Sequence, residues 1–315
     1  MIYVWRMKDY RKHSPKDPSK DKGKPSRKRG GGPQDGGYKG EKGKKTQPDR
    51  QGKRSYGNPR GVARDKSREK FKGKATLWGV HAVIEAWKNP ARTIKALYVT
   101  EEALKGVDRA LLAMDDRPQP TIIVRRDLDR MLPPGAVHQG IAIDVPSLEE
   151  VFIQDFVVSA AQKERSMIVV LDQVTDPHNV GAIMRSACAF GADGLVMQSR
   201  HAPDINGTLA KTASGAAEHI PVAYETNLSR AINHLQEAGY VAVALDERGE
   251  TDIASYDFPA KVVIVLGAEG KGLRQGLREN CDVTVRLPTG GPIGSLNVSN
   301  AAAVALYACS ACARK

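Results

Sequence analysis

Three segments of the chain combine glycine with polar side chains in the manner of ligand-binding loops. Residues 171–181 read Leu-Asp-Gln-Val-Thr-Asp-Pro-His-Asn-Val-Gly and lead on to Arg185. Residues 266–273 carry three glycines in the spacing G-x-x-G-x-G, which is neither the dinucleotide-binding fingerprint nor a P-loop. Residues 287–300 read Leu-Pro-Thr-Gly-Gly-Pro-Ile-Gly-Ser-Leu-Asn-Val-Ser-Asn. Glycine lets backbone approach a ligand closely, while amide, carboxylate and guanidinium groups can bind and orient a polar substrate.

Each of these segments follows a predicted β-strand, and helices alternate with the strands. The strands are expected at Met167–Val174, Gly194–Gln198, Val241–Leu245, Lys261–Gly267 and Val283–Leu287. The helices are expected at Val180–Phe190, Leu228–Ala238, Gly272–Asn280 and Leu296–Ala313. Short β-branched strands alternating with helices predict an α/β fold with a mostly parallel sheet covered on both faces. Ligands bind at the carboxyl ends of parallel strands, so the three segments should share one edge. Ordinary turn chemistry remains the alternative for any one of them.

A smaller α/β unit, residues 75–148, is expected before this domain. Its predicted strands are Ile94–Val99, Thr121–Val124 and Val137–Val145, and its predicted helices are His81–Trp87 and Ala103–Met114. Residues 149–166 read as a partly helical linker, which leaves residues 167–315 as the larger domain.

The net charge of +12, with a pI near 9.5, belongs to one end of the chain. Residues 1–74 hold 25 basic and 8 acidic residues, whereas the remainder holds 23 basic and 28 acidic residues. The first segment has too few apolar residues to offset its ordering entropy, so we predict a disordered basic arm. Its aromatic residues, Tyr38, Tyr56 and Phe71, favour RNA as the partner, and a solvated tail without a partner is the alternative.

Membrane insertion and secretion are not expected. No window reaches the ~18 uninterrupted apolar residues of a membrane helix, and the first residues lack the apolar core of a secretory signal. The cysteines Cys188, Cys281, Cys309 and Cys312 are too few and too scattered for a disulfide framework, which favours a cytoplasmic setting. Cys309-x-x-Cys312 has no second ligand pair, so we interpret it as core or interface packing and expect no metal site.

The three glycine-containing segments, in this order and spacing, resemble the signature motifs of the SPOUT superfamily in its SpoU/TrmH branch of RNA 2′-O-ribose methyltransferases. Residues 75–148, with the sequence Val-His-Gln-Gly-Ile at 137–141, resemble the ribosomal-protein-L30e-like RNA-binding domain of many members. The resemblance implies a Rossmann-like sheet with a C-terminal trefoil knot, S-adenosyl-L-methionine as cofactor, and a homodimer. The subgroup it most resembles methylates a guanosine of bacterial 23S rRNA.

The same resemblance assigns roles to individual residues. Gly267, Leu287 and Leu296 match positions that hold the cofactor, largely through backbone. The residues that match catalytic and substrate-positioning positions are Asn179, Arg185, Glu269, Ser295 and Asn297. Thr289 departs from the family pattern, in which a methionine is usual.

The reaction so implied is attack of a ribose 2′-oxygen on a sulfonium methyl group. Arginine has a pKa above about 12, so we expect Arg185 to bind the target phosphate and stabilise the developing alkoxide rather than act as a base. Pairing of Arg185 with Asp172 or Asp176 is the structural alternative. His178 is the rival base, because histidine titrates near neutrality. Glu269 either caps a loop or anchors Arg185 or the substrate, and Ser295 and Asn297 also suit helix capping.

Two alternatives to 23S rRNA methylation stay open. One is the same chemistry on a tRNA ribose, and the other is a non-catalytic RNA-binding factor for ribosome assembly. The target nucleotide is not legible in the sequence, because RNA is read largely by shape.

Overall fold

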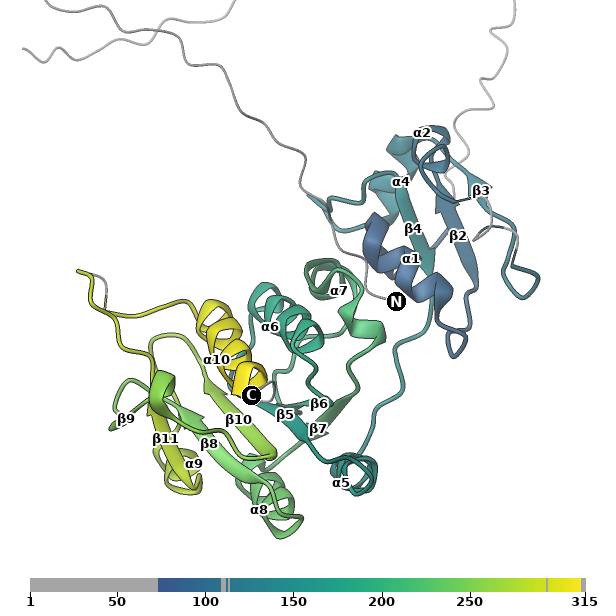
Figure 1. Cartoon of the computed structure of the whole chain (residues 1–315). Helices are drawn as coiled ribbons and strands as arrows, with labels where there is room; N and C mark the ends of the chain where they lie inside the picture. The colour runs from purple at the N-terminus through teal and green to yellow at the C-terminus, as the bar shows by residue number, and fades with distance from the viewer. Residues whose placement is uncertain (1–72, 109–111, 113, 293, 313–315) are drawn as a thin grey trace, which may run out of the picture. The chain divides into compact units, whose positions relative to one another are not determined.

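The computed structural model describes residues 73–108, 112, 114–292 and 294–312, which hold two β-sheets (Figure 1). Both sheets fall within one compact unit of the chain, which begins at Asp65. The predicted basic arm, residues 1–74, lies outside the described residues except for its last two positions, so it stays a prediction. Among the described residues, no helix is long and apolar enough to cross a membrane.

The larger sheet has seven strands in the order β7-β6-β5-β10-β8-β11-β9, and its recorded strand pairings are all parallel. The strands are β5 (Ser166–Asp172), β6 (Gly194–Gln198), β7 (Val222–Glu225), β8 (Val241–Leu245), β9 (Thr251–Asp252), β10 (Lys261–Gly267) and β11 (Val283–Arg286). The α/β sheet predicted from the sequence is therefore confirmed. Strand β5 is buried along its whole length, as expected for a strand covered on both faces.

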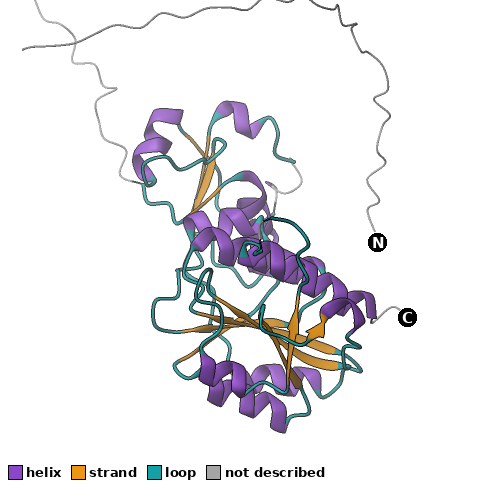
Figure 2. Cartoon of the chain, turned by 90° about the vertical axis from the view of Figure 1, so that its left-hand side faces the viewer, coloured by secondary structure: helices purple, strands orange, loops and turns teal. Residues whose placement is uncertain are grey.

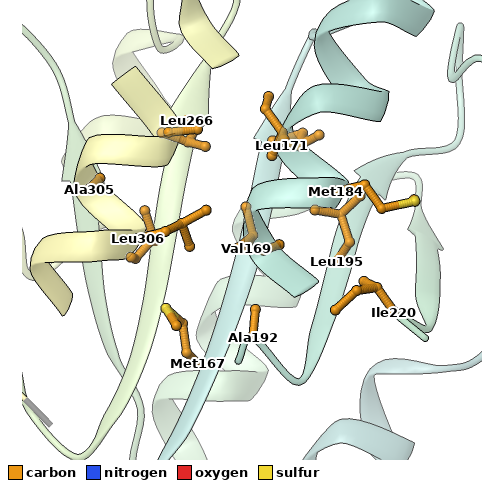
Figure 3. Close-up of a cluster of buried hydrophobic side chains, with 14 of the residues drawn as sticks. Met167, Val169, Leu171, Met184, Ala192, Leu195, Ile220, Leu266, Ala305 and Leu306 are labelled. Carbon is orange, nitrogen blue, oxygen red and sulfur yellow. The ribbon is translucent and has the colours of Figure 1, made fainter. Parts of the chain in front are cut away.

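Helices cover both faces of this sheet (Figure 2). One face packs against α6 (Pro177–Ala189), α7 (Gly207–Ala213) and α10 (Val298–Cys312), and the other against α5 (Ile153–Ala160), α8 (Leu228–Glu237) and α9 (Gln275–Glu279). Successive residues of β5 alternate between the two cores: Val169 and Leu171 join the first cluster, and Ile168 and Val170 the second. Figure 3 shows part of the first cluster, including Leu306 of α10.

The register of the central strands places their carboxyl ends at one level. Strands β5 and β10 pair over seven residues, ending at Gly267 opposite Asp172. Leu245, the last residue of β8, pairs with Leu266 of β10 and Val285 of β11. The loops that follow these strands therefore leave the same edge of the sheet, as the sequence predicts.

The smaller sheet has four strands in the order β1-β4-β2-β3, with antiparallel pairs except for the parallel pair β2–β3. Its elements are β1 (Leu77–Trp78), α1 (Val80–Lys88), β2 (Ala96–Val99), α2 (Glu101–Leu104), β3 (Thr121–Ile122), α4 (Arg125–Met131) and β4 (Ile141–Asp144). An α/β unit was expected here, and its three predicted strands are all shorter in the structure. Helix α2 ends at Leu104, and part of the predicted helix Ala103–Met114 lies outside the described residues. Strand β4 begins only after a turn at Gln139–Gly140.

A buried ion pair links the loop after α1 to the 3₁₀ turn η2 (Ala216–Glu218) of the larger domain. Arg92 donates from Nε and Nη2 to the Glu218 carboxylate at 2.9 and 2.8 Å, and the two side chains are only 4% and 2% exposed. Asn89 donates a further bond of 2.8 Å to Glu218. Arg117, also buried, donates to three backbone carbonyls of the same loop region. Each of these buried charges thus has several partners.

Candidate active site

A cavity of about 660 Å³ lies at the carboxyl ends of β8, β10 and β11. It is lined by three segments, namely Leu245–Arg248, Leu266–Gly272 and part of the chain between Leu287 and Ala301. Five of the residues singled out from the sequence line it together: Gly267, Glu269, Leu287, Ser295 and Leu296. Asn297 is a sixth. A cavity at this edge of a parallel sheet is the usual place for a ligand.

The loop after β10 folds tightly back on itself. A Cβ atom at Gly267 would overlap the backbone of Gly272 and Leu273, so only glycine fits there. Gly270 and Gly272 have φ of +76° and +63°, in the left-handed region that favours glycine. The glycines of the sequence G-x-x-G-x-G therefore form a compact turn whose backbone lines the cavity.

The loop after β11 is held by Thr289, whose hydroxyl donates to the Gly294 carbonyl at 3.0 Å. Gly290, Gly291 and Gly294 have open space around them, and Leu296 is half exposed beside them. Leu287 and Leu296 together with the loop backbone offer apolar surface next to polar main-chain groups. Such a combination of apolar and polar lining is typical of small-molecule sites.

A hydrogen-bonded cluster joins residues from three segments that are far apart in sequence. The Asn297 amide donates to Asn179 Oδ1 at 3.0 Å and also to Glu269 Oε1. The backbone N–H of Val298 donates to the same Glu269 oxygen at 3.3 Å. Asn297 Oδ1 accepts from the N–H of Ser299 at 2.9 Å, so Asn297 is the N-cap of α10. The carboxylate of Glu269 also favours this helix terminus, where backbone N–H groups are unpaired.

The carboxylate of Glu269 therefore caps the start of α10, and a role in anchoring the substrate stays a prediction. Its carboxylate accepts hydrogen bonds from Asn297 and Val298, and within the described residues it makes no contact with Arg185. Ser295 lies at the cavity, two residues before the N-cap, so α10 does not begin at Leu296 as the sequence predicts.

Arg185 is exposed on α6 and does not line the cavity. The alternative in which it pairs with Asp172 or Asp176 is wrong. Asp172 is completely buried and bonded to Arg274, with side-chain distances of 2.8 and 2.7 Å. Asp176 caps α6 by accepting from the N–H of His178 at 3.0 Å. Within the described part of the chain, the Arg185 guanidinium has no recorded ion-pair or hydrogen-bond partner and remains available to a ligand.

Two residues that the sequence interpretation missed, Asp246 and Arg248, also line the cavity. The Asp246 carboxylate accepts from Arg248 Nε and Nη2 at 2.7 and 2.9 Å and lies 3.7 Å from Arg278. Burial raises the pKa of Asp246, but the hydrogen bonds and charge of Arg248 outweigh it, and the net pKa lies below the ordinary value. Their position directly after β8 was the available signal, but this segment lacks the glycines that marked the other loops.

The Cys309-x-x-Cys312 pair is packed against the core. Cys309 is 3% exposed within the first hydrophobic cluster, and Cys312 lies partly buried against it. Burial raises the pKa of the Cys309 thiol to about 11, which keeps it protonated at neutral pH. Across the described residues, no group of three or more His, Cys, Asp or Glu side chains is arranged to hold a metal ion.

Family comparisons match both parts of the chain. A family model described as the SpoU rRNA methylase family matches residues 166–307, and one for RNA 2′-O ribose methyltransferase substrate binding matches residues 76–151. The chain is 36% identical over 232 residues to YacO of Bacillus subtilis (strain 168), which is named for the TrmH family of tRNA/rRNA methyltransferases. That match covers 73% of this chain and 92% of YacO.

A second relative and two solved structures agree with this match. An uncharacterized tRNA/rRNA methyltransferase of Mycobacterium sp. (strain KMS) is 39% identical over 215 residues, covering 67% of this chain and 68% of that protein. The SpoU methyltransferase AviRb from Streptomyces viridochromogenes, solved with AdoMet, has a TM-score of 0.63 at 24% identity and covers 75% of this chain and 89% of its own. An AdoMet-bound rRNA methyltransferase from Sinorhizobium meliloti has a TM-score of 0.61 at 24% identity, covering 75% and 86%. At these identities the structures establish likeness of fold.

Proposed function

Because the chain belongs to the SpoU/TrmH family of RNA 2′-O-ribose methyltransferases, we propose that it methylates a guanosine ribose of 23S rRNA. The protein is an RNA methyltransferase that uses S-adenosyl-L-methionine. The main observation behind this proposal is that the loops after β8, β10 and β11 line one cavity, beside the cluster of Asn179, Asn297 and Glu269. The non-catalytic alternative is set aside, since both family models that match the chain describe RNA methyltransferases.

The cavity suits S-adenosyl-L-methionine in size and lining. Its volume of about 660 Å³ falls in the usual range for sites of small molecules and cofactors. We propose that Leu287 and Leu296 pack on the adenine and that the backbone at Gly267 lines its edge. When bound, the cofactor supplies a methyl group on a sulfonium sulfur, which leaves as a neutral thioether.

The catalytic roles follow from which groups are fixed and which are free. Asn297 is held by Asn179 and Glu269, so this cluster fixes the start of α10 and the wall of the cavity. We propose that it positions the ribose, with Ser295 beside it. Arg185 is free and always charged, which suits binding of the target phosphate and stabilisation of the 2′-alkoxide as its proton leaves to phosphate or water. Good alignment of reacting groups alone supplies part of the ~7–11 kcal/mol available to oriented reactions.

Substitution of Arg185 tests this assignment. We expect Arg185→Ala to keep its fold and its affinity for S-adenosyl-L-methionine while losing about 10²-fold or more of its methyl-transfer rate. Circular dichroism, calorimetric titration of the cofactor and transfer of tritiated methyl groups measure the three quantities. Arg230→Ala is the matched control, because Arg230 is an exposed arginine on α8, at the other face of the sheet. Wild-type turnover in Arg185→Ala would overturn the assignment.

The target is tested by mapping the methylated nucleotide. Unmodified 23S rRNA and unmodified tRNA from a deletion strain, each incubated with the protein and labelled cofactor, separate the two substrate classes. Label in 23S rRNA at a guanosine supports the proposal. Label in tRNA alone would replace it with the tRNA alternative, which the names of the relatives also accommodate.

Three finer features of the family are proposed on the same basis. The exposed apolar residues Val304 and Tyr307 on α10 suit a homodimer interface, which sedimentation equilibrium would detect. The return of the chain from β11 through the loop at 287–297 to α10 suits a trefoil knot. The cytoplasm is the proposed setting, in keeping with four free cysteines.

The basic arm, residues 1–74, is proposed to add non-specific RNA affinity. Its deletion should weaken RNA binding and reduce the salt dependence of binding, and should leave cofactor affinity unchanged. An unchanged salt dependence would show that the arm serves another purpose.

A further inference from the structure

Two polar side chains converge where the smaller domain meets α7 of the larger one. A Cβ built on Gly79 would lie 3.3 Å from Lys211 Cγ and 3.5 Å from Gln139 Oε1, so both side chains rest against this glycine. Gln139 Oε1 also accepts from the N–H of Val80, at the start of α1, at 3.3 Å. Gly79 itself has a φ of +92°, so glycine is required there both by its backbone and by its neighbours. We call this group of Gly79, Gln139 and Lys211 the seam.

The backbone at Gln139 is held in an unusual conformation. Its φ of +57° is left-handed, which is uncommon for a residue other than glycine. His138, only 1% exposed, holds the turn: its Nδ1 accepts from the N–H of Gly140 at 3.0 Å. His138 Nε2 therefore carries the proton and donates to Asp129 at 2.8 Å. Strained backbone maintained by its surroundings is often found at functional positions. Here it presents an exposed amide beside Lys211.

The seam is connected to the catalytic cluster through α7 and α6. Thr212, next to Lys211, lies 3.4 Å from His178 Nδ1 through its hydroxyl oxygen. His178 directly precedes Asn179, which bonds to Asn297 at the cavity. The two helices are in close contact, since a Cβ at Gly181 of α6 would lie 2.6 Å from the Leu209 carbonyl of α7. A continuous series of contacts therefore runs from the turn at Gln139 to the cavity.

Both seam side chains have polar groups without protein partners. No carboxylate in the described part of the chain is recorded within ion-pair distance of the Lys211 ammonium, and the Nε2 amide of Gln139 has no recorded acceptor. By contrast, Arg92 pairs with Glu218, and Lys88 pairs with Glu85. An unpaired cation next to an exposed amide donor suits a phosphate and an adjoining sugar hydroxyl.

We propose that the seam binds the sugar–phosphate backbone of the substrate RNA between the smaller domain and the cavity. Lys211 contacts a phosphate, and Gln139 contacts the adjoining sugar hydroxyl. This inference rests on the proposed function and extends it by naming where the strand crosses from one domain to the other. Lys211 positions the RNA and takes no part in the methyl transfer itself.

The test compares Lys211→Gln with wild-type protein on unmodified 23S rRNA and tRNA from a deletion strain. We expect KM for RNA to rise about tenfold with kcat changed by no more than about twofold, because one charge-assisted hydrogen bond is lost. The slope of log affinity against log salt should fall by about one unit. Lys211→Arg should restore most of the affinity. Gln139→Gly, which suits the positive φ, should raise KM about fivefold.

Lys261→Gln is the matched control, because Lys261 begins β10 at the opposite end from the cavity. Lys211 lies in the last turn of α7, where a cation also stabilises a helix terminus. If Lys211→Gln lowers Tm but leaves KM and the salt slope unchanged, that helix role is the whole role and the proposal is overturned. An equal loss in Lys261→Gln would overturn it as well. Filter binding measures the salt slope without methyl transfer, so it tests the seam independently of activity. If the wild-type protein methylates neither RNA, the proposed function is rejected whatever the binding result.

Discussion

Two polar networks of the protein differ in how much of their hydrogen-bonding capacity is used internally. In the network of Arg92, Glu218 and Asn89, the ion pair lies out of solvent, and both of its ends have several partners. The cluster of Asn179, Asn297 and Glu269 borders a cavity and is largely exposed. A buried charge must be satisfied within the protein, whereas an exposed group can exchange water for a ligand. The first network thus suits domain attachment, and the second suits chemistry.

The largest expected effect comes from breaking the buried network of Arg92, Glu218 and Asn89. Glu218→Ala leaves the Arg92 guanidinium buried without its carboxylate, and such a change costs about 3–5 kcal/mol of unfolding free energy. Urea denaturation measures it. Lys88→Ala, which removes the exposed pair with Glu85, is the control and should cost no more than about 0.5 kcal/mol. A loss below about 1 kcal/mol in Glu218→Ala would mean that the network contributes little to stability.

Substitutions in the exposed cluster of Asn179, Asn297 and Glu269 should lower activity more than stability. Asn297→Ala removes the group that joins Asn179 to Glu269, and displacement of the cavity wall should lower methyl transfer about 10²-fold. The lost N-cap should cost only about 1 kcal/mol. Asn227→Ala provides the comparison, since Asn227 caps α8 by accepting from the N–H of Arg230 at 3.2 Å. It should lose similar stability and keep its activity, and equal activity losses in both variants would contradict a special role for Asn297.

The smallest effect is expected at the Asp246–Arg248 pair, which is buried at one end and exposed at the other. Asp246→Asn should cost about 1 kcal/mol at neutral pH, as for an ion pair partly screened by solvent. The folded pKa of Asp246 lies below its unfolded value, so the pair stabilises the fold above that unfolded pKa of about 3.9. The difference between wild type and variant should therefore shrink as pH falls below about 4, measured by urea denaturation from pH 7 to pH 3. A difference independent of pH would show that the carboxylate charge is unimportant.

The parts of the fold that the sequence predicts best are those determined by local pattern. Strands β6, β8 and β10 match their expected bounds, because each is a short apolar or β-branched run. Strand β7 and helix α7 were missed: β7 has four residues, and α7 begins at Gly207, a poor helix former. Their positions depend on tertiary packing, since a Cβ at Gly207 would overlap the Trp78 indole of the smaller domain.

In the candidate site, too, local pattern predicts some features, and others depend on tertiary structure. The strand-end rule predicts that residues 171–181, 266–273 and 287–300 share one edge. Residues of the second and third segments line one cavity, and Asn179 of the first bonds to Asn297 beside it. The bond between Asn179 and Asn297 joins residues 118 positions apart, so no local pattern could reveal it. Arg185 likewise does not pair with Asp172, because Asp172 pairs with Arg274 instead. This follows only from the three-dimensional arrangement.

The pairing of β5 with β10 has a consequence for biosynthesis. The two central strands are separated by the whole run of β6 to β9, so the middle of the sheet cannot close until most of the chain has left the ribosome. The last wall of the cavity comes from residues 287–301, which are made later still. Such long-range pairing slows folding and prolongs the exposure of apolar strands. During translation, the smaller domain can therefore fold first, well before the chain is able to hold its methyl donor.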